Sequence, residues 1–476
     1  MEKIKLILMY LGGKLRRQFF MALPEDEKDF DKSRKYYIAA DSASQLITQL
    51  AGGTFLMTLL SYIGMSDGVI GTVLSLVTLG AVFQLIAMNR VQRFSKFKPF
   101  VSASVLQKVW FGVIFIIPLF SMKELWMQII ICSIFLFAQI ASQMGVPASM
   151  DWIASLVPSN ERGKYFSRKD AFAVFFTVFG MFVMGVLLDV TKGKHLKLGF
   201  LLIGIVLILL ALLNFISFVK MKEPRTRLMN AEGKELHGSL AKKELKKQSH
   251  ESFGIRWEIR YAFSSDRFRK ALMLNLLWTT AFYIGMPFNN SYQVKELGLS
   301  YTYIMLITLV TAILRVAITP GIGKKADRSG SPLMLLWTLA SIGLYYLTMI
   351  FTVPENGKIF FTVATIFAAV GWSFIAIGLF NIQLMCVDRT RRMQQYTILS
   401  GVSGLYGFLI SVVGGVMVDC FQKNRFLIGG RLIFAQQWMN LFGLLFILLT
   451  MTYLYVRVKP LKQEHDEEDG KFSPHI

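Results

Sequence analysis

Cysteine, histidine and charged residues are all scarce in this sequence. Asp, Glu, Lys and Arg make up 17% of the 476 residues, and only three Cys and five His occur. Cys132, Cys386 and Cys420 lie in or beside apolar runs, so they indicate neither a disulfide framework nor a thiolate metal site. The motifs HExxH and GxSxG and the P-loop are also absent. We therefore expect no enzyme activity, no metal, no cofactor and no use of ATP as an energy source.

Apolar residues are abundant instead, at 54% of the chain. They fall in runs of about 20 residues, the length of a helix that crosses a bilayer. Backbone polar groups in lipid need partners within their own segment, so each run should be a helix. The sequence predicts an all-α membrane protein with twelve transmembrane helices, at about 37–62, 68–88, 99–121, 125–147, 170–190, 198–220, 271–293, 301–322, 333–353, 358–386, 396–418 and 432–456.

Basic residues exceed acidic ones, 52 against 30, and most of them fall in the two tails and the even-numbered loops. Positive loops stay in the cytoplasm, so we expect both termini on the cytoplasmic side of the cell membrane. This topology explains the charge of +22 without nucleic acid as a partner. The long basic stretch near the middle separates the predicted units, which are a cytoplasmic N-terminal segment (1–35), a six-helix bundle (36–220), a cytoplasmic linker (221–268), a second six-helix bundle (269–457) and a cytoplasmic tail (458–476).

The two halves also repeat in sequence. Gly185-Val-Leu-Leu-Asp189 ends the fifth predicted span, and Gly415-Val-Met-Val-Asp419 ends the eleventh, 230 positions later. Arg162 and Arg392 match at the same offset. A near-constant offset between halves of equal span count predicts two pseudo-symmetric bundles.

Two loops resemble motifs of the major facilitator superfamily. Residues 323–330, Gly-Lys-Lys-Ala-Asp-Arg-Ser-Gly, are similar to its G-x-x-x-D-R-x-G motif, and residues 157–168 are similar to its V-P-x-x-x-R-G-x-x-x-x-R pattern. The matching loop of the first half, 89–96, lacks the Asp and the Gly. The fifth span lacks the Gly-Pro…Gly-Gly pattern of the family's proton-coupled drug antiporters. The resemblance covers about 35–457 and implies a secondary transporter that works by alternating access.

Polar side chains recur on one face of several spans. Polar groups that face lipid are costly, so such faces should line a central cavity or bind neighbouring helices. The predicted substrate-binding residues are Gln45, Thr48, Gln49, Gln143, Asn275, Trp278, Thr279, Tyr283, Asn289, Asn290, Trp372, Ser373 and Asn381. Amides and hydroxyls hydrogen-bond sugar hydroxyls and aromatic rings stack on sugar faces, so we expect a sugar or glycoside. Export of amphiphilic or drug-like compounds and a non-transporting receptor with this fold are the alternatives.

Three charges inside predicted spans have more than one interpretation. Asp41 is a candidate for ion coupling, but it could also pair with a cytoplasmic Arg or cap its helix. Lys108 and Arg315 could serve the cavity or a gate, or extend their side chains toward the membrane surface.

The cytoplasmic motifs predict a gate. Asp327 and Arg328 should contact the region of Arg162 and Arg168 when the cytoplasmic side is closed. The full set of gating candidates is Gly323, Asp327, Arg328, Gly330, Arg162, Arg168 and Arg392. The expected partners are a small-molecule substrate, a coupling proton or sodium ion in a symport reaction, and the lipid bilayer, and we expect a monomer.

Overall fold

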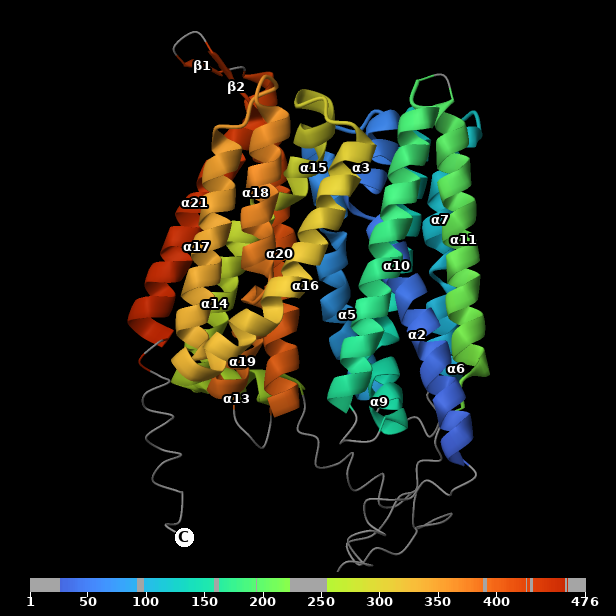
Figure 1. Ribbon diagram of the computed structural model, residues 1–476, viewed down its shortest axis with the longest axis vertical. Coiled ribbons are helices and arrows are strands. Elements are labelled where there is room, and N and C mark those ends of the chain that lie inside the picture. Colours follow the sequence, from blue (N-terminus) through green and yellow to red (C-terminus); the bar gives the residue numbers. More distant parts are fainter. Residues whose placement is uncertain are drawn as a thin grey trace, which may run out of the picture.

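The computed structural model describes residues 26–91, 98–157, 162–193, 195–222, 255–387, 392–424, 426–428, 431–458 and 460. The predicted cytoplasmic segments therefore lie mostly outside the described residues. Nearly everything described is helical (Figure 1). The fold prediction is confirmed, with one small addition, an antiparallel hairpin of β1 (Phe426–Ile428) and β2 (Arg431–Ile433). Residue 432, the predicted start of the last span, belongs to this hairpin.

The helices fall into two sets that follow the chain. The N-terminal half, up to residue 222, holds α2 (Asp26–Leu50), α3 (Gly53–Tyr62), α4 (Asp67–Leu74), α5 (Leu76–Val91), α6 (Lys98–Leu106), α7 (Val109–Ile116), η1 (Ile117–Leu119), α8 (Glu124–Met144), α9 (Val146–Leu156), α10 (Arg162–Thr191) and α11 (Leu196–Lys220). The C-terminal half, from residue 255, holds α13 (Ile255–Ser264), α14 (Asp266–Tyr283), η2 (Met286–Phe288), α15 (Asn289–Ser291), η3 (Tyr292–Glu296), α16 (Tyr301–Ser329), α17 (Ser331–Ile350), α18 (Gly357–Trp372), α19 (Ile375–Cys386), α20 (Arg392–Lys423), α21 (Ala435–Tyr453) and η4 (Leu454–Val458).

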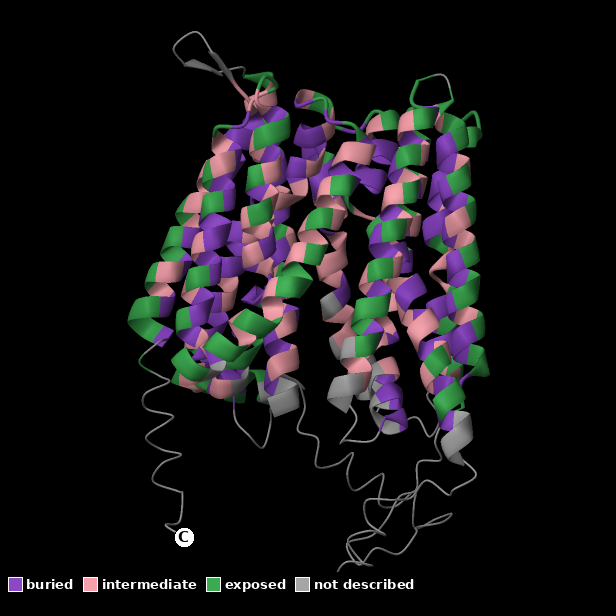
Figure 2. Cartoon of the chain, in the orientation of Figure 1, coloured by how far each residue is buried: buried purple, intermediate pink, exposed green. Residues whose placement is uncertain are grey.

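Eleven helical segments of the described chain are long and apolar enough to cross a membrane. The first predicted span is not among them, and it is divided into α2 and α3 at Gly52 and Gly53. Gly53 has a φ of 48°, a conformation that side chains disfavour. Large apolar side chains such as Phe175, Trp337 and Ile359 are exposed. Exposed positions recur along the length of the outer helices (Figure 2). Such a surface suits lipid rather than water.

Prolines break two of the predicted spans. Gly145 and Pro147 separate α8 from α9, and Pro287 follows the end of α14 and lies in η2. A third difference concerns α16, which continues to Ser329 through the segment predicted as a loop. The turn comes at Gly330, whose φ of 88° favours glycine.

The two ends of the molecule are distinguished by where the chain passes from one half to the other. At the linker end, α11 finishes at Lys220 and α13 begins at Ile255, and the opposite side is the far end (Figure 1). Between these ends, α10 packs against α16 and α5 packs against α20, so both contacts join the two halves. The space between the halves is where a shared cavity would form.

Candidate functional site

A cavity of about 270 Å³ lies between the halves, beside the middle of α10 and α16. Among the helices that line it, α2 and α10 belong to the N-terminal half, and α16 and α18 belong to the C-terminal half. The fourteen lining residues are Gln45, Gln49, Val174, Thr177, Val178, Met181, Thr308, Thr311, Ala312, Arg315, Thr365, Ala368, Ala369 and Trp372. The volume is at the lower end for ligand pockets, so the cavity fits a small solute.

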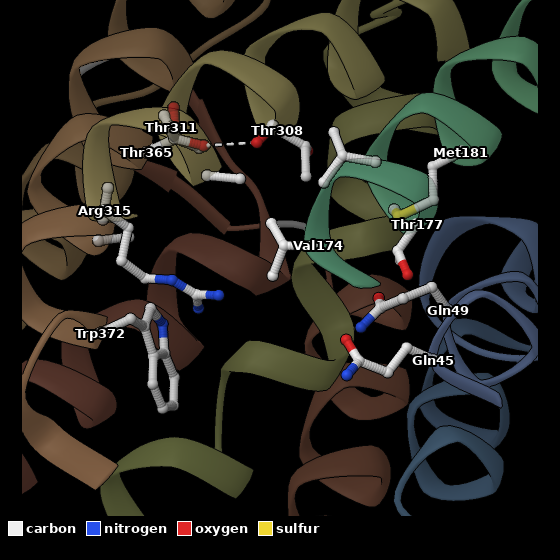
Figure 3. Close-up of a pocket in the computed structure, with 14 residues that line it drawn as sticks. Gln45, Gln49, Val174, Thr177, Met181, Thr308, Thr311, Arg315, Thr365 and Trp372 are labelled. Atoms are coloured by element: carbon white, nitrogen blue, oxygen red, sulfur yellow. Dashed lines mark hydrogen bonds between the residues drawn. The ribbon is translucent and has the colours of Figure 1, made fainter. Parts of the chain in front are cut away.

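The two walls of the cavity carry different chemistry (Figure 3). Arg315 and Trp372 project from the C-terminal half, and Gln45, Gln49 and Thr177 project from the N-terminal half. Arg315 is the only charged residue among the fourteen. The sequence analysis had predicted Gln45, Gln49 and Trp372 as substrate-binding residues and Arg315 as a coupling candidate, and the structure brings all four together here.

Trp372 is held in place by aromatic neighbours. Trp278 and Phe282 pack against its ring edge-to-face, at centroid distances of 5.6 and 5.4 Å. Phe282 also contacts Tyr283, at 4.8 Å. Such contacts add specific geometry to the apolar burial. Trp278 and Tyr283 therefore lie behind the cavity wall rather than among the residues that line it.

An intramembrane charge cluster lies next to the cavity in the N-terminal half. The Asp41 carboxylate accepts a hydrogen bond from Gln45 at 2.9 Å and forms an ion pair with Lys169 at 2.8 Å. Lys169 is buried and also pairs with Asp170, at 2.7 Å. The alternative that Asp41 pairs with a basic residue is thus observed, although the partner is a lysine inside the span. Lys169 was missed because the predicted fifth span began at residue 170.

Lys108 lies in the same half of the molecule. Its ammonium donates a hydrogen bond to the Ser44 hydroxyl, at 2.5 Å. Ser44 precedes Gln45 on α2, so Lys108 supports the helix that carries two cavity amides. This contact is a specific packing role inside the N-terminal half.

The other predicted substrate-binding residues do not line the cavity. Asn275 donates to Ser403 at 2.6 Å and accepts from Gln383 at 3.1 Å. Asn289 is buried and donates to Tyr345 at 2.8 Å. These bonds connect helices within the C-terminal half, the packing alternative for polar faces. The remaining residues lie as follows: Gln143 accepts from Gln84, Thr48 and Ser373 donate to their own helices, Thr279 is buried, Asn290 accepts from Thr54, and Asn381 donates to Ser331.

The far end is sealed by two equivalent carboxylates. Asp189, at the end of α10, accepts hydrogen bonds from the backbone N–H groups of Tyr301 at 3.0 Å and Thr302 at 2.6 Å. These are the first residues of α16, in the opposite half. An anion at a helix N-terminus satisfies free N–H groups and the positive end of the helix dipole. Asp189 therefore ties the halves together.

Asp419 makes the matching contact in reverse. From the end region of α20 it accepts bonds from the Ser66 hydroxyl at 2.7 Å and the Gly68 N–H at 2.9 Å, at the start of α4. Gly415, one turn earlier, lets the backbones approach, because a Cβ there would come within 2.5 Å of the Gly68 carbonyl oxygen. The two carboxylates occupy equivalent positions of the sequence repeat, and each one holds the start of a helix in the opposite half at the far end.

Further polar contacts reinforce this seal. Buried Asp67 forms an ion pair with Lys295 at 2.6 Å and accepts a hydrogen bond from Gln422 at 2.7 Å. Thr58 and Tyr301 bond through their hydroxyls at 3.1 Å. Each contact joins the two halves on the far side of the cavity. The cavity is thus closed toward the far end.

The predicted cytoplasmic gate is only partly within the described residues. The side chains of Asp327, Arg162 and Arg392 lie outside the described ones, and Arg168 and Arg328 are exposed. Gly323 sits inside α16, in open space. The contact between these groups stays a prediction.

Comparison with known proteins agrees with this architecture. The family model of the Major Facilitator Superfamily matches residues 42–416. The chain belongs to the major facilitator superfamily. As a member of this superfamily, the protein is a multi-pass membrane transporter. Proteins of the superfamily are in general not enzymes. No curated protein matches its sequence.

Solved structures show the same fold at low sequence identity. The nucleoside transporter NupG superposes with a TM-score of 0.61 at 14% identity, covering 89% of this chain and 98% of that one. A bacterial homologue of the iron transporter ferroportin in its inward-facing state gives 0.64 at 12% identity, with coverages of 90% and 98%. A D-xylose–proton symporter gives 0.56 at 16% identity, with coverages of 88% and 96%. These similarities are similarities of fold.

Proposed function

We propose that this superfamily member is a secondary transporter that moves a small polar solute, most plausibly a sugar or glycoside, by alternating access. The observation that carries the proposal is a central cavity that is lined by both halves. Contacts between those halves close it toward the far end. Rocking of the halves would break these contacts and expose the same cavity to the other side. The solved nucleoside and xylose transporters of similar fold make a hydroxylated solute a reasonable first class to test.

The linker end would face the cytoplasm, since the basic tails and loops favour that orientation. The structure would then be the inward-facing state, with its outer side closed by Asp189, Asp419 and the Asp67–Lys295 pair. The motifs around Arg162 and Asp327 would close the cytoplasmic side in the opposite state.

Asp41 is the residue through which a coupling ion would act. Its carboxylate joins a cavity amide, Gln45, to the buried ammonium of Lys169. Protonation of Asp41 would weaken its pair with Lys169 and free the Gln45 amide to turn toward the cavity. Ion binding and solute binding would thus both act through the Asp41 side chain.

A test of alternating access needs no knowledge of the substrate. Cys132, Cys386 and Cys420 are first replaced by Ser, and Gln49→Cys places a single thiol in the cavity. Membrane vesicles of known orientation are then treated with a membrane-impermeant maleimide from either side. We expect labelling from the linker side, and labelling from the far side as well when the seal is weakened by Asp189→Asn.

The matched control is a thiol outside the pathway, Val190→Cys, at an exposed position on α10. Its labelling should depend on the side of addition alone and should ignore Asp189→Asn. Labelling of Gln49→Cys from one side under every condition would contradict transport and favour a receptor with this fold.

A further inference from the structure

The most informative unexplained group in the molecule is the guanidinium of Arg315. Its side chain projects into the cavity from α16 (Figure 3). Among the described residues it has neither an ion pair nor a side-chain hydrogen bond. The fourteen lining residues include no Asp or Glu. Arg315 is exposed, so an anion from outside the chain can reach its guanidinium in the cavity.

The nearest acidic cluster is already neutralised. Asp41 is engaged by Lys169 and Gln45, and Asp170 is engaged by the same lysine. Lys108 adds a further positive charge in this half. The two carboxylates are therefore matched by two ammonium groups. Arg315 then gives the cavity its net positive charge.

The opposite wall offers unsatisfied neutral groups. The Thr177 hydroxyl is buried and has no hydrogen-bond partner within the part of the chain that the structure describes. Gln49 likewise makes no side-chain bond among those residues, and Gln45 uses its NH2 group on Asp41, which leaves its carbonyl oxygen available. Thr177 lines the cavity but its hydroxyl oxygen is itself buried, so the polar groups that a ligand can reach on this wall are the Gln45 carbonyl oxygen and the Gln49 amide.

The threonines near Arg315 complete this arrangement. Thr308, Thr311 and Thr365 donate their hydroxyl protons to carbonyl oxygens of their own helices. Their oxygens can then act toward a ligand only as acceptors. The cavity therefore combines one bidentate cationic donor with several groups that accept from hydroxyls.

We infer that the substrate is a small hydroxylated monocarboxylate, such as a sugar acid, whose carboxylate binds Arg315 and whose hydroxyls bind Gln45 and Gln49. This inference rests on the proposed transport function and narrows its substrate class. A guanidinium matches a carboxylate with two parallel hydrogen bonds. A phosphate dianion would leave one negative charge uncompensated in this cavity.

The test uses pairs of sugars that differ only in charge. The purified protein in detergent is heated with glucose, glucuronate, glucuronamide and glucose 6-phosphate, and with the corresponding galactose series. A ligand that binds the folded state raises the melting temperature. We expect stabilisation by a carboxylate, none by its neutral amide at the same concentration, and a weaker effect of the phosphate.

Variants then assign the effect to Arg315. Arg315→Gln should weaken carboxylate binding about 10- to 100-fold, because hydrogen bonds to charged groups are strong. Arg315→Lys keeps the positive charge but lacks the planar guanidinium, so its affinity for the carboxylate should lie between those of Arg315→Gln and the unmodified protein. Arg269→Gln, at an exposed position paired with Asp266, is the control and should bind like the unmodified protein.

Two outcomes would overturn the inference. Equal stabilisation by the neutral sugar and the acid, unchanged in Arg315→Gln, would refute the anion site but leave sugar transport intact. Failure of every carboxylate in the panel to stabilise the protein would refute it too. The labelling of Gln49→Cys tests alternating access without any substrate, so failure of the transport proposal would be recognised separately.

Discussion

The carboxylate of Asp189 should control how often the far end opens. Its two oxygens each accept one backbone N–H, Oδ1 from Tyr301 and Oδ2 from Thr302. Asp189→Asn keeps the shape but replaces one acceptor by an NH2 group, which then faces an N–H donor. The substitution removes one hydrogen bond, weakens the other and loses the interaction with the helix dipole.

The expected size of the effect follows from these losses. Hydrogen bonds to charged groups contribute about 1.5–3 kcal/mol and neutral ones about 0.5–1.5 kcal/mol. Loss of the first bond alone should therefore cost the sealed state about 2 kcal/mol, which is the smallest effect expected. Each 1.4 kcal/mol changes an equilibrium tenfold, so the population with an open far end should rise about 30-fold. Asp419→Asn should act similarly, and the double variant should combine both effects until the open state dominates.

The assay measures how fast a sealed thiol becomes reactive. Ser411 is fully buried at the seal, where its hydroxyl donates to the Gly71 carbonyl oxygen. Ser411→Cys, in a background without native cysteines, should react with a membrane-impermeant maleimide in proportion to the open population. The rate should rise about 30-fold with Asp189→Asn.

Asp266→Asn provides the matched control. Asp266 also lies in the first turn of a helix, α14, but at the linker end, where it pairs with Arg269 and Lys270 of its own helix. Its variant should leave the thiol rate unchanged. Unchanged rates in Asp189→Asn, Asp419→Asn and the double variant would refute the idea that these carboxylates hold the far end closed.

Three further predictions use the same background. Gly68→Ala would bring a Cβ within 2.1 Å of a carbonyl oxygen of the other half, so it should open the far end and raise the same labelling rate. Lys169→Gln leaves Asp41 without its cation and should cost about 3–5 kcal/mol of stability, seen as a lower melting temperature, whereas Asp41→Asn combined with it should recover most of the loss. Gly330→Ala forces a side chain to a φ of 88° and should destabilise the protein by about 1–3 kcal/mol in melting experiments, whereas Gly323→Ala, in open space within α16, should not.

The sequence predicted the fold well because membrane insertion leaves few choices. Runs of apolar residues fix the helices, and the repeat around Asp189 and Asp419 fixes the two-bundle plan. Gln45, Gln49 and Trp372, whose polar or aromatic groups interrupt apolar faces, were among the predicted residues and line the cavity.

The difference between the predicted substrate-binding residues and the residues that line the cavity has one physical cause. Periodicity identifies the polar face of a helix, but the same face suits a cavity or a neighbouring helix. Asn289 meets Tyr345 and Asn440, so its amide is spent on packing. Thr177 was missed for the opposite reason, because a single hydroxyl in an otherwise apolar span gives no pattern. Only the arrangement of helices reveals that this oxygen has no hydrogen-bond partner within the described part of the chain.

The paired caps at the far end also bear on how such a chain could arise. Ser66 and Ser300 both begin helices and differ by 234 positions, and the carboxylates that meet those helices differ by 230. A single six-helix protein with one such Asp and one such Ser would make both contacts at once by pairing with its own copy around a two-fold axis. Joining two copies in one gene would preserve that closure, and would let later changes, such as the Asp67–Lys295 pair, appear on one side only.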